Sequence, residues 1–204
     1  MTRPVLRTLG VAGALALVPS FAFAHTGVGD THGFVHGFLH PVTGLDHVLA
    51  MVTVGLLAWQ MGGRALWLLP VSFMALMVVG GLLGMGGFAL PYVETGITLS
   101  VVVLGAVVAF GVKAPLAVAM GLVGLFAVFH GHAHGAEMPE SAGALSYGAG
   151  FVVGTGLLHL AGLGLGFGIG WLSEQLGKTS GAALVRGAGA AVAVAGVALL
   201  SGVL

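Results

Sequence analysis

The sequence predicts an all-α, polytopic membrane protein in which a signal peptide precedes a bundle of six transmembrane helices. Of its 204 residues, 58% are hydrophobic and 6% are charged, whereas a soluble domain carries roughly a quarter charged residues. Six Lys+Arg and six Asp+Glu residues cannot give a chain of this size a polar surface. This composition excludes a soluble enzyme and a disordered chain, so we expect a membrane protein that is not an enzyme.

The charge balance and the cysteine count exclude further classes. The formal net charge is zero, and nucleic-acid binding would need a basic stripe. The chain has no cysteine, which excludes disulfides and thiolate metal sites. Nine histidines remain as the most informative polar residues.

Residues 1–24 have the pattern of a secretory signal peptide. Arg3 and Arg7 precede a short apolar run, and an A-x-A motif ends at Ala24, as in cleavable signals. Cleavage there would leave 25–204 as one transmembrane domain. An uncleaved signal anchor is the alternative.

The rest of the chain divides into apolar segments that are long enough to cross a bilayer. Glycine, proline and charged residues separate them. The expected spans are 44–61, 65–85, 95–112, 114–129, 144–172 and 182–204. Glycines four residues apart within the spans predict closely packed helices; they are Gly80/Gly84, Gly150/Gly154 and Gly162/Gly166/Gly170.

The distribution of Lys and Arg predicts the orientation of the spans. If the first span starts outside, the basic residues fall at cytoplasmic ends, as the positive-inside rule expects. These residues are Arg64, Lys113, Lys178 and Arg186. Most histidines, the start of the mature chain and the C-terminus then lie on the outer side.

A first group of histidines precedes the first span. His32, His36 and His40 are spaced four residues apart, so they share one face if this segment is helical. Pro41 then starts or kinks the helix that follows, because it has no N–H to donate. An exposed segment without a metal role is the alternative for His32 and His36.

Asp46 and His47 follow, about one turn inside the first span. A carboxylate beside an imidazole in an apolar helix is costly unless it is paired or bound to a metal. Imidazole nitrogens together with a carboxylate suit nickel, cobalt and zinc. A structural hydrogen-bonded pair is the alternative. Met51 lies one turn further and either adds a thioether or fills space.

A second group lies where the fourth span ends. His130, His132, His134 and Glu137 fall within eight residues on a glycine-punctuated stretch, which we expect to be flexible enough to wrap a divalent cation. A nonspecific metal-collecting loop is the milder alternative.

His159 is a lone imidazole at mid-depth in the fifth span. Ionisable residues at that depth are functional candidates by default.

If the signal peptide is cleaved after Ala24, His25 becomes the N-terminus, and its α-amine and imidazole could chelate a metal ion.

Three segments resemble the HupE/UreJ family of metal permeases. The first is His40-Pro41-x-x-Gly44-x-Asp46-His47-x-x-Ala50-Met51-x-x-Val54-Gly55, which is similar to the family signature. Phe129-His130-Gly131-x-Ala133-His134-Gly135-x-Glu137 resembles the second family motif, and 157–162 resembles the third. The resemblance covers nearly the whole chain.

The resemblance implies a secondary transporter for nickel, or for cobalt, in a bacterial inner membrane. It implies delivery of the ion toward hydrogenase or urease maturation, with the metal as substrate and no prosthetic group. A homo-oligomer is compatible with this interpretation. Carried over residue by residue, the pathway residues are His36, Asp46, His47, His130 and His134, followed by His159.

We expect the outer histidines to collect the ion and pass it to Asp46 and His47, which face His130 and His159. Because binding needs unprotonated imidazole, uptake should weaken below pH ~6.5. A rival hypothesis is a redox protein whose His47 and His159 ligate haem. A histidine-based sensor or proton channel is a third hypothesis.

Overall fold

The computed structural model describes residues 33–138, 143–175 and 181–204, and within these ranges it contains helices and no β-strand. The predicted all-α class is therefore confirmed, whereas the predicted signal peptide, His25 and His32 lie outside the described residues. The helices are α2 (Gly33–Thr43), α3 (Leu45–Met61), α4 (Ala65–Met85), α5 (Val93–Phe110), α6 (Leu116–Ala136), α7 (Ala144–Gln175) and α8 (Gly181–Leu200).

Five of these helices, α4 to α8, are long and apolar enough to cross a membrane. The pair α2 and α3 makes a sixth candidate span if it counts as one unit, although the two helices meet at an angle of 80°. Large apolar side chains cover the outside of the bundle, as on Leu82, Leu125 and Leu160, which are 62%, 56% and 61% exposed. An apolar exterior of this kind suits contact with lipid rather than water.

The break between α2 and α3 lies at Gly44, three residues after Pro41. Gly44 has an extended backbone with ψ of 122°, whereas Pro41 is still inside α2 and buried. The fixed φ of proline is compatible with a helix. A Cβ atom at Gly44 would lie 2.9 Å from Asp46 Oδ1 and 3.0 Å from His47 Nδ1, so glycine leaves room for these two side chains. The chain therefore bends at Gly44, and Asp46 and His47 fall in the first turn of α3.

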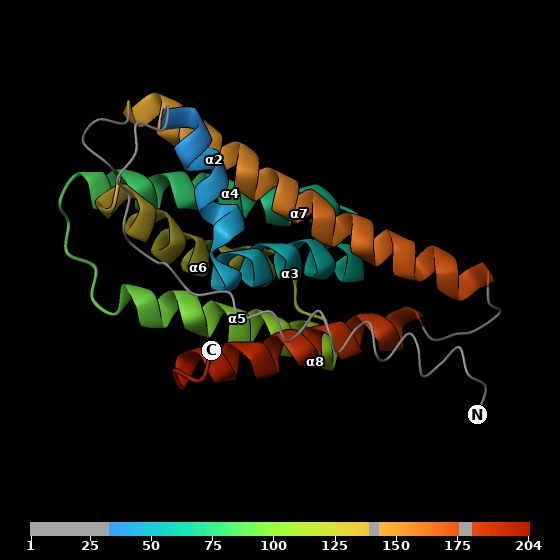
Figure 1. Ribbon diagram of the computed structural model, residues 1–204. Helices are drawn as coiled ribbons and strands as arrows, with labels where there is room; N and C mark the ends of the chain where they lie inside the picture. Colours follow the sequence, from blue (N-terminus) through green and yellow to red (C-terminus); the bar gives the residue numbers. More distant parts are fainter. Residues whose placement is uncertain (1–32, 139–142, 176–180) are drawn as a thin grey trace, which may run out of the picture.

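Helix α3 is the centre of the bundle. It packs against α4, α5, α7 and α8, and nine of its 17 residues are buried. The other helices pair around it, with α4 along α6, α5 along α8, and α2 and α3 along α7 (Figure 1). The polar residues at the start of α3 therefore lie within the bundle.

The closest helix contacts occur at glycines, as the sequence predicts. A Cβ atom added to Gly131 of α6 would overlap the carbonyl oxygen of Met77 in α4, and one added to Gly80 would overlap that of Val128. Without side chains at these positions, the two backbones approach closely enough to pack in lipid.

The expectation that the fourth span ends at Phe129 and runs into a flexible loop is wrong. Helix α6 continues to Ala136, so His130, His132 and His134 are helical and buried. The physical reason is that Gly131 and Gly135 fit against the α4 backbone. This packing holds a glycine-containing segment helical despite its low intrinsic propensity.

We predict that Gly131→Ala lowers the thermal stability of the protein, whereas Gly121→Ala on the same helix does not. The first change forces a methyl group into the α4 backbone, at a cost of about 1–3 kcal/mol, but the second meets no atom within 4 Å. Thermal unfolding of the detergent-purified variants measures both. Equal melting temperatures for the two variants would contradict this account of the α4–α6 contact.

Candidate metal site

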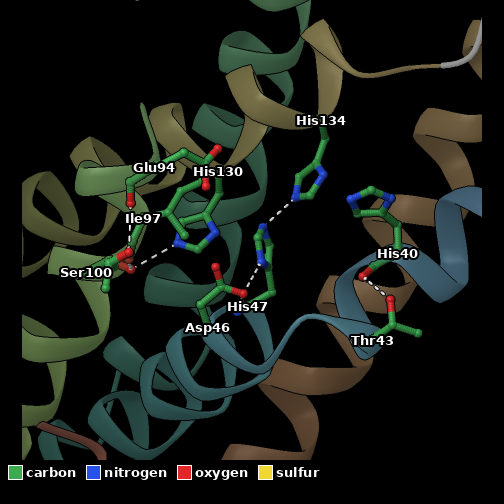
Figure 2. Close-up of polar contacts among 10 residues, drawn as sticks. His40, Thr43, Asp46, His47, Glu94, Ile97, Ser100, His130 and His134 are labelled. Carbon is green, nitrogen blue, oxygen red and sulfur yellow. Dashed lines mark hydrogen bonds and ion pairs between the residues drawn. The ribbon is translucent and has the colours of Figure 1, made fainter. Parts of the chain in front are cut away.

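Polar side chains converge at the end of the bundle where α3 begins and α6 ends. Helices α3, α5 and α7 run in one direction along the bundle and α4, α6 and α8 in the other. Figure 2 shows His40 of α2, His47 of α3, and His130 and His134 of α6 turned toward one another. Two groups that are far apart in the sequence therefore form one cluster.

The Asp46 carboxylate orients the imidazole of His47. Its Oδ1 atom accepts the backbone N–H of His47 at 2.8 Å and contacts the ring Nδ1 at 2.7 Å. A carboxylate has no proton to offer when ionised, so Nδ1 carries the hydrogen. In the neutral ring, Nε2 then presents a lone pair, which is the arrangement of metal-binding histidines that a carboxylate supports.

His47 Nε2 meets His134 Nε2 at a distance of 2.6 Å (Figure 2). Two nitrogen lone pairs repel at this distance, so one proton lies between them. Because the Nε2 of neutral His47 is unprotonated, His134 donates that proton. Two imidazoles bound to one metal ion lie about 3 Å apart at their nitrogens, since each bond measures about 2.0–2.1 Å. An ion could thus replace the proton after a shift of a few tenths of an ångström.

His130 lies beside this pair and is completely buried. Its ring centroid is 4.8 Å from that of His47, and the rings meet edge to face. The Nε2 atom is 3.0 Å from Ser100 Oγ on α5. The Nδ1 atom has no hydrogen-bond partner among the described residues, so one buried nitrogen remains available to a ligand.

A second group of ligand atoms adjoins the first and shares His134 with it. One ligand atom each from His40, His134 and Glu137 lies within 4.8 Å of the others. The His40 and His134 ring centroids are 4.4 Å apart. Glu137 is exposed, His40 half-buried and His134 buried, so this group connects the surface with the buried pair.

Two of the remaining candidate residues occupy other places. His36 lies beside the cluster. Its ring centroid is 6.0 Å from that of His40 and 5.7 Å from that of Tyr147. His132 points elsewhere, since its Nε2 bonds the carbonyl oxygen of Phe88 at 2.6 Å. Residues two apart on a helix face opposite sides, so His132 lies on the other face of α6 from His134.

His159 lies deeper in the bundle, and the ring of Phe73 contacts both His159 and His130 of the cluster. The Phe73 centroid is 5.6 Å from that of His130 and 5.1 Å from that of His159. His159 is 1% exposed, and neither of its ring nitrogens has a hydrogen-bond partner among the described residues. It is therefore a second buried imidazole with available nitrogens, one aromatic ring further into the bundle.

The arrangement suits a divalent cation better than haem. The haem hypothesis requires His47 and His159 to face each other across a flat slot. Instead, His47 contacts His134 and His130, and the ring of Phe73 lies against His159. Convergent imidazole nitrogens with a nearby carboxylate are typical ligands of nickel, cobalt and zinc.

Sequence reasoning missed Ser100, Phe73 and Tyr147. Ser100 is a buried hydroxyl within the apolar run of α5, and a lone polar residue in a span often bonds to another helix. That signal could have identified Ser100. The two aromatic residues do not differ in sequence pattern from ordinary core residues.

The fold and the cluster define a class: a multi-span helical membrane protein with a buried histidine site at one end of its bundle. The HupE / UreJ protein family model matches residues 13–199. The chain therefore belongs to the HupE/UreJ family, as its motifs indicate.

A curated relative supports this assignment. Protein HupE of Rhizobium leguminosarum bv. viciae is 50% identical over 189 residues, which cover 93% of this chain and 94% of that protein. No solved structure matches the chain significantly.

We predict that His134→Ala and His132→Ala have different effects although the residues are two positions apart. His134→Ala should weaken Ni²⁺ binding by more than about tenfold, since even an outer-shell partner contributes about 10–100-fold. His132→Ala should leave binding intact but lower stability by about 0.5–1.5 kcal/mol, because it removes the hydrogen bond that His132 donates to the Phe88 carbonyl oxygen.

Isothermal titration with Ni²⁺ and thermal unfolding of the same samples separate the two effects. Weaker Ni²⁺ binding in His132→Ala than in His134→Ala would contradict the assignment of faces on α6.

Proposed function

We propose that this chain is a secondary transporter that imports a divalent transition-metal ion, with nickel as the first candidate and cobalt as the second. The observation that carries the proposal is the convergence of imidazoles from α2, α3 and α6, with the His47 lone pair directed at the others. Membership of the HupE/UreJ family supports it. The ion is the cargo, and no prosthetic group takes part.

The first step is capture at the surface. Glu137 is exposed and lies with His40 and His134, so a hydrated cation meets a carboxylate and two imidazoles before it enters the bundle. His134 also contacts His47, which provides the next ligand. Each transfer then exchanges one ligand at a time, and the ion never has to lose all its water at once.

The second step is binding between His47 and His130. Asp46 supplies negative charge through its contact with His47, and this charge offsets that of the cation where the dielectric constant is low. Moderate affinity follows from a site built of neutral, exchangeable imidazoles, whereas a closed all-protein cage would trap the ion.

The third step passes Phe73. Its buried ring contacts both His130 and His159, and we assign it as the barrier that an ion displaces on the way to His159. A barrier below the outer cluster is what alternating access requires of a transporter. His159 then serves as the inner ligand.

The orientation of the protein in the membrane follows from the charges at the helix ends. Arg64 precedes α4, and Lys113 lies between α5 and α6, at the end of the bundle opposite the histidine cluster. The positive-inside rule places that end in the cytoplasm. The cluster and the C-terminus then face the periplasm of the inner membrane, and the imported ion becomes available for hydrogenase or urease maturation.

We predict that the double variant Asp46→Asn with His47→Ala loses metal accumulation, because it removes both the oriented lone pair and the negative charge. Cells expressing the variant are incubated separately with trace Ni²⁺, Co²⁺ and Zn²⁺, and metal content is measured. His132→Ala is the matched control. The proposal is refuted if the double variant reaches the membrane at the wild-type level and the accumulation of every ion is unchanged.

We also predict that His159→Leu separates binding from transport. Uptake should fall about tenfold, as for a barrier raised by about 1.4 kcal/mol, while Ni²⁺ binding to the purified protein stays within about twofold because the outer cluster is intact. Wild-type uptake in this variant would show that the ion does not use His159.

A further inference from the structure

We propose that Ser100 is a positioning residue that sets the tautomer of His130 and thereby directs the His130 Nδ1 lone pair at the metal ion. The inference rests on the proposed function, since it assigns a role within the same site. Ser100 lies on α5, which contributes none of the candidate ligands. Its role depends on where one hydroxyl hydrogen points.

The hydroxyl hydrogen of Ser100 points at the backbone of its own helix. Ser100 Oγ donates to the carbonyl oxygen of Ile97 at 2.5 Å. Two oxygens approach this closely only with a hydrogen between them, and a carbonyl has none to give. The single hydrogen of Ser100 is therefore in use, and toward any other neighbour the hydroxyl oxygen is an acceptor.

That neighbour is His130 Nε2, at 3.0 Å from Ser100 Oγ. Because the hydroxyl only accepts here, Nε2 must carry the hydrogen of the neutral ring. The Nδ1 atom then holds the lone pair. Ser100 and His130 are both 0% exposed, so water does not compete for either group.

The geometry directs this lone pair into the cluster. In Figure 2 the ring nitrogen of His130 that does not contact Ser100 faces His47. Nδ1 has no hydrogen-bond partner among the described residues, and an unsatisfied buried acceptor is unfavourable. A bound cation removes this cost. The other tautomer would place an N–H where the ion binds and two acceptors, Ser100 Oγ and Nε2, against each other.

Ser100 and Asp46 therefore each orient the ring of one histidine, but only Asp46 carries a charge. Asp46 orients His47 and makes it a stronger ligand through its negative charge. Ser100 is neutral, so it orients His130 without adding that charge. The site thus combines one strong and one weaker imidazole ligand, which suits an ion that must leave toward the inner side.

The test uses the purified full-length protein with ¹⁵N-labelled histidine, studied by NMR without metal and by titration with Ni²⁺. The spectrum of His130→Ala identifies the His130 signals by difference. Ser100→Ala removes the acceptor of the Nε2 hydrogen, and Ser100→Thr keeps a hydroxyl at the same position. Thr98→Ala is the matched control, since the Thr98 hydroxyl donates to the Glu94 carbonyl oxygen on the same helix.

We expect His130 in the wild-type protein to be protonated at Nε2 and unprotonated at Nδ1. Ser100→Ala should mix the two tautomers and weaken Ni²⁺ binding about 10–100-fold. Ser100→Thr should restore both properties, and Thr98→Ala should match the wild type.

Two results would overturn the inference. One is a wild-type His130 protonated at Nδ1, and the other is Ser100→Ala with the wild-type tautomer and the wild-type Ni²⁺ affinity. Failure of the wild-type protein to bind Ni²⁺ would instead refute the proposed function, because the tautomer is measured without metal.

Discussion

The contact between Asp46 and His47 controls the chemistry of the whole site. One carboxylate oxygen holds both the backbone N–H and the ring N–H of the next residue, so the opposite nitrogen of the neutral ring can only accept. Because α3 begins one residue earlier, this carboxylate also lies at the positive end of the helix dipole, which favours its ionised form. The direction of the His47 lone pair then determines which other side chains can share a ligand with it.

Tight helix packing brings those side chains within reach. Gly131 allows α6 to lie directly on the backbone of α4, and this contact keeps the end of α6 helical and inside the bundle. Buried imidazoles in a membrane protein are costly unless they have partners. Here the partners are one another, a carboxylate and a hydroxyl, so the polar groups lie together inside a bundle whose exterior is apolar.

Composition and periodicity were enough to predict the helical class and, apart from the end of the fourth, the candidate spans. The family resemblance led to the expectation that His47 faces His130. These signals were not enough to predict that α6 extends past Phe129, because packing against α4 overrides the weak helix propensity of its glycines. For the same reason the sequence could not distinguish the roles of His132 and His134. In a loop both side chains could bind one ion, whereas in a helix they point to opposite faces. The role of Ser100 depends on a contact between helices that no local pattern records.

The most direct test of the shared site is X-ray absorption spectroscopy of the purified protein loaded with one equivalent of Ni²⁺. The account predicts scattering from several imidazole rings around a single nickel ion, reduced by one ring in a His47→Ala variant. A spectrum with oxygen ligands alone, or one unchanged by the loss of His47, would contradict the claim that these helices build a common metal site.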